Sequence, residues 1–358
     1  MSIPMDMPPM PIPISKITTK VLNTSSSELS NQLPYLELKS SDTSYAAKEY
    51  KITTNDLLEY LDLMNKYENI KLYFDFSEID LSEIFAKLPN VKSLVLSSNN
   101  PVFTQPNVYY NDSIQIYPAK LEKLVFSMKI CKDKITSSSD WNNNIALLPS
   151  TLKHLSLLGY TDPLPILPSG LKSLVLGEHF NQPVDNLPNS LEKLYLGEQF
   201  DKTLYNLPNS LEELHLGDYF NQPLDNLPYS LKKLYIKSSF FKFPVDNLPI
   251  GLEILQLGYM YREPMNNLPI TLKYLDIISF ISPKPRTLNT LPDSIEHLVM
   301  DFTGENIDKL PANLKILEYI ANDDSDFDNS DFNNSDFDKI YLLEEKYPNV
   351  TFKNINDS

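Results

Sequence analysis

The sequence contains little cysteine and little glycine. It has one cysteine in 358 residues, Cys131, so no disulfide can form within the chain. We therefore expect a cytoplasmic protein or, alternatively, a nuclear one, since both compartments are reducing. Glycine occurs 8 times and proline 28 times. Because proline interrupts regular backbone, this ratio predicts a chain that turns often and at regular intervals.

Long apolar runs are also missing. No stretch approaches the ~18 consecutive apolar residues of a membrane span. Residues 1–9 lack the basic start and the unbroken apolar core of a signal peptide. We therefore expect neither membrane insertion nor secretion, although a hydrophobic fraction of 42% is sufficient for a folded core.

Basic residues are outnumbered by acidic ones, and the formal net charge is −16. Part of this excess lies between Lys315 and Lys339, where aspartates occur and no other basic residue does. An acidic surface repels phosphate backbones, so we do not expect a nucleic-acid partner.

One residue pair, Leu-Pro, recurs along the chain. From Leu148 to Leu310, nine of these pairs form a regular series with successive spacings of 19, 20, 20, 20, 21, 20, 23 and 19 residues. A fixed period near twenty residues is typical of a solenoid, in which each repeat packs only against its neighbours. The leucines of the pairs are Leu148, Leu167, Leu187, Leu207, Leu227, Leu248, Leu268, Leu291 and Leu310.

Each pair is followed by a segment in which apolar and polar residues alternate, as in Leu191-Glu-Lys-Leu-Tyr-Leu196. We number each repeat from the first apolar residue of this segment. Positions 4 and 6 are apolar and position 2 is charged, which predicts one short strand per repeat with positions 4 and 6 inside. Glycine at position 7, as at Gly197, predicts a positive φ or a tight reversal after the strand. The same pattern buries Leu194, Leu196, Leu214 and Leu216.

Asparagine recurs at position 16, directly before the Leu-Pro pair. We interpret this row as a structural ladder of buried amides that bond to the backbone of neighbouring coils. The alternative is a row that recognises a ligand, but an adjacent Leu-Pro pair would bury the amides, which favours the ladder. Its members are Asn186, Asn206, Asn226, Asn247 and Asn267.

The repeats resemble the FNIP-type repeat of amoebae and their large viruses and, more distantly, leucine-rich repeats. The resemblance rests on Phe180-Asn-Gln-Pro183 and Phe220-Asn-Gln-Pro223, with weaker copies at Phe200, Phe240 and Tyr261. It implies a protein-interaction module. Relatives that also carry an N-terminal F-box are substrate adaptors of ubiquitin ligases.

The fold class expected from the repeats is a leucine-rich-repeat-like solenoid. It has one long parallel sheet, built from strand-turn-coil repeats of about twenty residues, and short helices mainly in the N-terminal cap and near the C-terminus. The predicted parts are a disordered Pro/Met/Ser-rich segment (1–34), an N-terminal cap with irregular longer repeats (35–147), the regular repeats (148–320), a disordered Asp/Asn/Ser-rich loop (321–339) and a C-terminal helix–strand cap (340–358).

The predicted helices of the caps span residues 55–64, 82–88 and 340–347. No F-box helix is evident before residue 50, where residues 35–38 have the pattern of a strand. The spacing of Asp324, Asp326 and Asp328 is similar to the start of an EF-hand loop. The glycine and glutamate that such a loop requires are replaced by Asn329 and Ser335, so we interpret the segment as a loop rather than a calcium site.

No motif for a phosphate loop, a zinc protease or a serine hydrolase occurs. The histidines at strand positions, His154, His215 and His297, are predicted to lie on separate strands, and Cys131 has no placed base. We therefore expect neither an enzyme nor a bound cofactor or metal.

Positions 3 and 5 of the strands form the candidate partner-binding face, which is predicted to be exposed. Aromatic residues contribute much of the energy of protein interfaces, although tyrosine also favours strands for other reasons. The first hypothesis is a scaffold or adaptor, monomeric by preference, that binds a protein partner here. The others are a ubiquitin-ligase adaptor with a cryptic F-box-like N-terminus and a structural or self-assembling solenoid. The face consists of Lys193, Tyr195, Glu213, His215, Lys233, Tyr235, Gln256, Tyr274 and Asp276.

Overall fold

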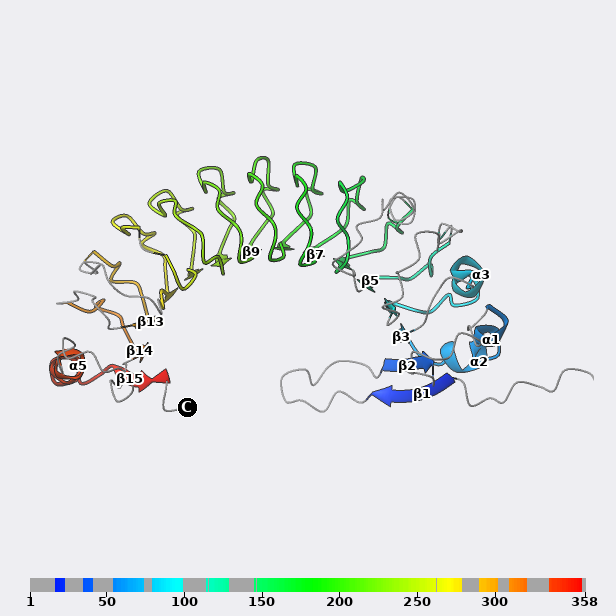
Figure 1. The fold of residues 1–358 in the computed structure, drawn as a ribbon, viewed down its shortest axis with the longest axis horizontal. Helices are drawn as coiled ribbons and strands as arrows, with labels where there is room; N and C mark the ends of the chain where they lie inside the picture. The colour runs from blue at the N-terminus through cyan, green and yellow to red at the C-terminus, as the bar shows by residue number, and fades with distance from the viewer. Residues whose placement is uncertain are drawn as a thin grey trace, which may run out of the picture. The chain divides into compact units, whose positions relative to one another are not determined.

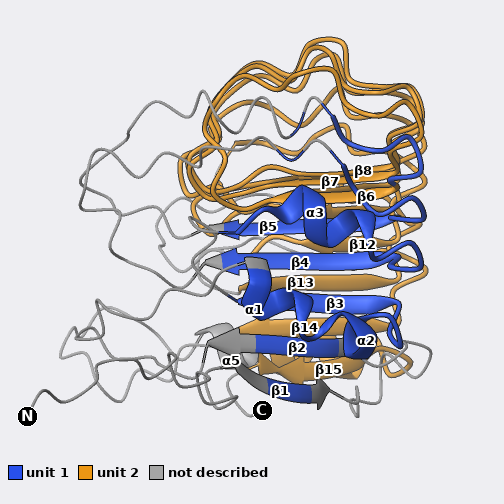
Figure 2. Ribbon diagram, turned by 90° about the vertical axis from the view of Figure 1, so that its right-hand side faces the viewer, with its two compact units in different colours: residues 1–152 blue, residues 153–358 orange. Residues whose placement is uncertain are grey.

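The structure is a computed structural model of the chain. It describes residues 17–22, 35–40, 54–73, 79–98, 114, 116–128, 145, 147–261, 263–278, 290–301, 309–320 and 335–355. The chain divides into two compact units, Met1–Leu152 (unit 1) and Lys153–Ser358 (unit 2), which are coloured separately in Figure 2.

Unit 1 combines a sheet with three short helices in its described part. Strands β1 and β2 pair antiparallel, and β2 to β5 continue the sheet in parallel and in chain order. The strands are β1 (Ile17–Leu22), β2 (Tyr35–Ser40), β3 (Asn69–Tyr73), β4 (Ser93–Ser98) and β5 (Lys123–Met128). The helices are α1 (Thr54–Leu58), α2 (Leu61–Met64) and α3 (Leu81–Ala86).

Local sequence explains these elements. The Asp80 side chain caps α3 by accepting a hydrogen bond of 3.1 Å from the Glu83 backbone N–H. The helix predicted at 55–64 is present as two short helices, α1 and α2, separated by a turn. In β3 the alternation of Ile70 and Leu72 with polar neighbours places both apolar side chains in the core.

Unit 2 contains the regular repeats, each forming one coil with one strand. All its strands are parallel, and they line the inner side of the curve of this unit, while the returning turns form its outer side (Figure 1). The strands are β6 (His154–Leu157), β7 (Ser173–Leu176), β8 (Lys193–Tyr195), β9 (Glu213–Leu216), β10 (Lys233–Ile236), β11 (Ile254–Gln256), β12 (Tyr274–Asp276), β13 (His297–Asp301), β14 (Ile316–Ile320) and β15 (Thr351–Asn354). The helix α5 (Ser335–Lys346) precedes β15.

The core of unit 2 follows the predicted register. Leu194, Leu214 and Leu234 lie opposite one another on β8, β9 and β10 and are fully buried. Leu196 and Leu216 are buried as well, so the predicted inward positions 4 and 6 are confirmed.

A stack of buried aromatic rings runs behind the strands, one ring from each of six successive coils. Neighbouring ring centroids are 5.7 to 6.3 Å apart. Phe240 was predicted to be the equivalent of the motif residues Phe180 and Phe220. This prediction was wrong, because Phe240 is 53% exposed and Phe241 occupies the stack. The repeat that contains it is one residue longer than its predecessor, which shifts the phenylalanine by one place. The stack consists of Tyr160, Phe180, Phe200, Phe220, Phe241 and Tyr261.

The predicted asparagine ladder is wrong. All five asparagines, Asn186, Asn206, Asn226, Asn247 and Asn267, are exposed at the turn that precedes the Leu-Pro pair. Asparagine suits such turns because it tolerates left-handed backbone, and Asn206 has a φ of 57°. Of these five, only the Asn267 side chain bonds to the preceding coil within the described residues, through a 3.0 Å hydrogen bond from its Nδ2 to the Asp246 carbonyl.

Two other rows of side chains connect the coils instead. At position 20, the Ser190, Ser210 and Ser230 hydroxyls each donate to a leucine carbonyl of the preceding coil, at 2.6 to 2.7 Å. At position 11, directly after the ring of the stack, Asn181 Oδ1 accepts from the Asp201 backbone N–H at 3.1 Å. Asp201 Oδ1 accepts in turn from the Asn221 backbone N–H at 3.0 Å.

The position-11 row ends at the repeat with the extra residue. The buried Asn221 Oδ1 finds no hydrogen-bond partner in the described part of the chain. The polar link to the next coil passes instead through Asp218, whose Oδ1 accepts from the Ser239 backbone N–H at 3.1 Å and from its hydroxyl at 2.7 Å.

Two predicted disordered segments contain regular structure. Residues 17–22 within the segment 1–34 form β1, whose backbone pairs antiparallel with β2. Helix α5 begins at Ser335, inside the predicted loop 321–339. The segment of the rejected calcium site, 324–334, lies outside the described residues, as does Cys131.

Glycine at position 7 is required by the close approach of coils. None of Gly177, Gly197 and Gly217 has the positive φ that was one of the two predicted reasons. A Cβ added at Gly197 would lie 2.2 Å from the carbonyl oxygen of Gly177 in the preceding coil, well inside van der Waals contact.

Replacing Gly197 with alanine should therefore destabilise unit 2, by about 1–3 kcal/mol or more, since the clash is with backbone that cannot rotate away. Gly251→Ala is the matched control, because its nearest new contact would be an ordinary 3.4 Å from the Tyr229 carbonyl oxygen. Chemical denaturation of both variants measures the difference. Equal midpoints would contradict the close approach.

A second comparison tests which row connects the coils. Ser210→Ala removes the donor to the Leu191 carbonyl and should cost about 1 kcal/mol of unfolding free energy. Asn226→Ala, at an exposed turn, should stay within about 0.5 kcal/mol of wild type. Urea denaturation of the two variants is the measurement, and the reverse order of costs would restore the asparagine ladder.

Candidate partner-binding face

The nine predicted face residues come together on one side of the sheet from β8 to β12. Their backbone register places them in two rows. One row runs through position 3 and consists of Lys193, Glu213, Lys233 and Tyr274, with Ile254, which is not one of the nine, between Lys233 and Tyr274. The other runs through position 5 and consists of Tyr195, His215, Tyr235, Gln256 and Asp276.

Three rings at position 5 stack face to face. The centroids of Tyr195 and His215 are 4.1 Å apart with an angle of 18° between the ring planes, and those of His215 and Tyr235 are 4.1 Å apart at 13°. Strands of a sheet are spaced ~4.8 Å apart, so flat side chains at one position of adjacent strands are held in stacking distance. We call Tyr195, His215 and Tyr235 the ring row.

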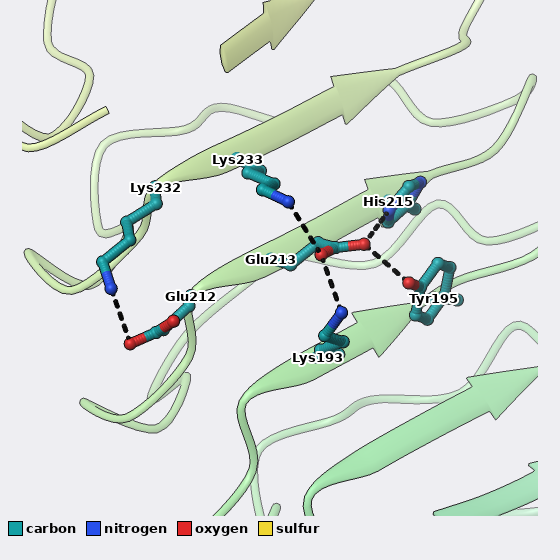
Figure 3. A network of polar contacts seen from close by, with 7 residues as sticks. All are labelled: Lys193, Tyr195, Glu212, Glu213, His215, Lys232 and Lys233. Atoms are coloured by element: carbon teal, nitrogen blue, oxygen red, sulfur yellow. Dashed lines mark hydrogen bonds and ion pairs between the residues drawn. The ribbon is translucent and has the colours of Figure 1, made fainter. Parts of the chain in front are cut away.

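The ring row is fixed by the carboxylate of Glu213 (Figure 3). The Tyr195 hydroxyl donates to Oε1 of Glu213 at 2.6 Å, and Nε2 of His215 lies 2.8 Å from the same oxygen. The ammonium groups of Lys193 and Lys233 lie 3.2 and 3.8 Å from the other oxygen, Oε2. A single side chain thus connects three strands.

Electrostatics keep this carboxylate ionised. Burial raises the pKa of Glu213, but the hydrogen bonds from Tyr195, His215 and Lys193 outweigh it and lower the pKa to about 2. Burial lowers the pKa of His215, against the opposing effect of Glu213, so the ring is neutral at pH 7. Because an ionised carboxylate can only accept, His215 carries its proton on Nε2 and presents an unprotonated Nδ1.

The other end of the face is organised around Asp276. Its Oδ2 accepts from Nε2 of Gln256 at 2.8 Å, and its Oδ1 accepts from the Ile278 backbone N–H at 3.3 Å. Burial, with a contribution from Glu318, raises the pKa of Asp276, and the two hydrogen bonds oppose this shift. The pKa of Tyr274 is raised to about 12 by burial and by the charges of Asp276 and Glu318.

The prediction that the whole face is exposed was wrong for two residues. Glu213 and Asp276 are each only 8% exposed, and side chains of neighbouring face residues bond to both carboxylates. The ring row and the network beneath it could not be read from one repeat, since they join residues of three different repeats.

The remaining candidate groups are not brought together. His154, His215 and His297 lie on β6, β9 and β13, as expected. In the described ranges, no three His, Cys, Asp or Glu side chains are arranged to hold a metal ion. Among the same residues, no helix is long and apolar enough to span a membrane.

The sequence reasoning missed an exposed apolar row beside this face. Tyr229, Ile250 and Ile270 are 85%, 66% and 75% exposed, at the turns that lead into β10, β11 and β12. The two preceding coils carry Asn189 and Asn209 at the same place, so this change from polar to apolar was the available signal. Adjacent exposed apolar side chains are typical of interaction surfaces. We call Tyr229, Ile250 and Ile270 the edge row.

The repeats match a known family. Residues 160–199 and 200–239 each match the model of the FNIP Repeat. Residues 160–239 are therefore FNIP repeats. Each match starts at an aromatic residue of the buried stack, Tyr160 or Phe200. In these FNIP repeats the motif aromatic residue therefore supplies the core ring, and the Asn or Asp that follows Phe180, Phe200 and Phe220 supplies the position-11 row.

Comparison with solved structures returns leucine-rich-repeat proteins. CroV588, described as a novel circular leucine-rich-repeat structure, is similar with 21% identity and a TM-score of 0.44 over 79% of this chain. The chain spans 50% of the length of CroV588. YopM from Yersinia enterocolitica WA-314 is similar with 17% identity and a TM-score of 0.30, over 70% of this chain and 69% of YopM. No curated protein matches the sequence.

The Glu213 network makes stability depend on pH. The pKa of Glu213 in the folded chain, about 2, lies below its ordinary value of 4.5, so its contribution is present above pH 4.5 and is lost as the pH falls toward 2. Glu213→Gln should therefore be less stable than wild type at neutral pH, and the difference should shrink over this window. Thermal unfolding across pH measures it.

Glu212→Gln serves as the control. Its carboxylate is half-exposed and pairs only with Lys232, at 2.8 Å, so removing its charge should have little effect at any pH. If Glu213→Gln behaved like Glu212→Gln, the network would contribute nothing to stability.

Proposed function

We propose that this chain is a non-enzymatic scaffold or adaptor, acting as a monomer, and that a protein partner binds to the strand face from β8 to β12. The observation that carries the proposal is the ring row. Its side chains are already ordered by stacking and by Glu213, so a partner would bind them with little further loss of side-chain entropy. Ordered aromatic side chains are frequent anchors of protein interfaces.

The polar groups of the face also suit a protein partner. The unprotonated Nδ1 of His215 can accept a hydrogen bond, and the half-exposed ammonium groups of Lys193 and Lys233 can donate. A polypeptide surface supplies backbone N–H and C=O groups and apolar side chains together. The edge row adds apolar area next to the strands of the face.

The general acidity of the chain disfavours nucleic acid as the partner. The single cysteine favours a reducing compartment, such as the cytoplasm, for the interaction. A role as a ubiquitin-ligase adaptor would require a helical element before residue 50. The residues described there are the strands β1 and β2, so we treat this role, like self-assembly, as an outcome of the test.

The test is affinity capture with the full chain, followed by titration of the partner it identifies. Tyr195→Ala/Tyr235→Ala should weaken partner binding about 10-fold or more, because both outer rings of the row are lost. The matched control is Tyr205→Ala/Tyr341→Ala, which removes two exposed tyrosines outside the face and should leave the affinity unchanged. Circular dichroism verifies that both variants are folded.

Equal binding by the two double variants would place the interaction elsewhere. Co-purification of ligase subunits by both would support the adaptor role. Concentration-dependent oligomers without a heterologous partner would identify a self-assembling solenoid.

A further inference from the structure

Two buried carboxylates on the strand face differ in the positive charge that lies next to them. Glu213 and Asp276 are equally buried and lie three strands apart on the same side of the sheet. Glu213 has two lysine ammonium groups within 4 Å. Asp276 has no Lys, Arg or His within ion-pair distance among the residues that the structure describes, and its hydrogen bonds come from the neutral Gln256 amide and one backbone N–H.

The groups that act on Asp276 are neutral or acidic apart from His297, whose charge lowers the pKa of Asp276. Tyr274 lies on the same strand, Gln256 on the preceding one and His297 on the following one. Tyr274 meets His297 edge to face, with the ring centroids 4.9 Å apart. The carboxylate of Glu318 on β14 also acts on Asp276 and raises its pKa, and Glu318 is itself approached by His297 and by Lys353, each at 3.4 Å.

We infer that the protein partner supplies an ion pair for this carboxylate, by placing an arginine or lysine side chain against Asp276 and Tyr274. This inference rests on the proposed function and specifies the partner as one with an exposed basic segment. Burying a carboxylate without a counter-ion is costly, so an added cation is strongly favoured there. The ring of Tyr274 offers the same cation a second favourable contact.

The charge of the whole molecule agrees with this occupant. A chain with a net charge of −16 attracts basic segments over a distance and repels acidic ones. At the opposite end of the face, Lys193 and Lys233 already pair with Glu213 and would repel a further cation. We therefore expect the cation of the partner at the Asp276 end.

The test uses a pair of peptides that differ only in charge. The probe is fluorescein-labelled Gly-Arg-Gly-Arg-Gly amide, and its uncharged counterpart carries citrulline in place of arginine. Fluorescence anisotropy at low ionic strength measures binding to the full chain. Asp276→Asn should weaken binding of the arginine peptide about 10-fold, and the citrulline peptide should bind neither protein.

Glu212→Gln is the matched control, because it removes one negative charge outside the two rows. Equal weakening by both substitutions would mean that only the net charge attracts the peptide. The inferred contact between the cation and Asp276 would then be wrong. Asp276→Asn retains an oxygen that can accept from Gln256, so folding should persist, and a thermal melt verifies it.

A second measurement does not depend on a variant. Burial raises the pKa of Asp276 in the free chain, so binding of the arginine peptide should weaken as the pH falls through that raised pKa, where the carboxyl becomes neutral. His297 and Glu318 also face this site, so the same profile is measured in His297→Gln and in Glu318→Gln, and it should keep its shape if Asp276 is the group responsible. NMR of the Asp276 carboxyl should show its pKa falling when the peptide is bound, and an unchanged pKa would contradict the inference.

The two proposals can fail separately. If Tyr195→Ala/Tyr235→Ala abolishes binding of the identified partner while Asp276→Asn does not, the partner-binding face stands and the cationic contact is wrong. If only Asp276→Asn abolishes it, the cationic contact stands and the ring row is not the anchor.

Discussion

The structure of unit 2 depends on the distance between neighbouring coils, which parallel strand pairing holds at ~4.8 Å. At this distance there is no room for a side chain between two backbones, which explains why Gly177, Gly197 and Gly217 follow the strands. The same distance brings each side chain against its equivalent in the next coil. Phenylalanines therefore stack in the core, and serine hydroxyls reach the carbonyls of the preceding coil.

The candidate site follows from the same constraint. On the open side of the sheet, equivalent positions of β8, β9 and β10 hold a tyrosine, a histidine and a tyrosine, and their rings stack because the backbone leaves them no other spacing. Position 3 of the same strands holds Lys193, Glu213 and Lys233, so the carboxylate lies between two cations. The face is thus ordered before any partner arrives, and its properties are set by which residues occupy adjacent coils rather than by any single repeat.

Much of the fold could be predicted from the sequence, because the period of the Leu-Pro pairs identifies equivalent residues and the two-residue alternation identifies the inner ones. Leu194 and Leu214 were placed correctly on this basis. The period does not say which way a residue outside the strand points. For that reason the asparagines of position 16 were wrongly predicted to be buried. Within the candidate site, the residues of the face were predictable but the burial of Glu213 and Asp276 was not, since it depends on the lengths of neighbouring side chains.

The repeat with 21 residues shows how the solenoid accommodates a change in length. The extra residue displaces Phe240 outward and leaves Asn221 Oδ1 without a partner, yet Leu234 and Leu255 still pair in register on β10 and β11. Length variation is absorbed in the turns and does not reach the sheet. In evolutionary terms, a coil can gain a residue in its turns, or exchange its two residues on the open side of the sheet, while the neighbouring coils keep their alignment.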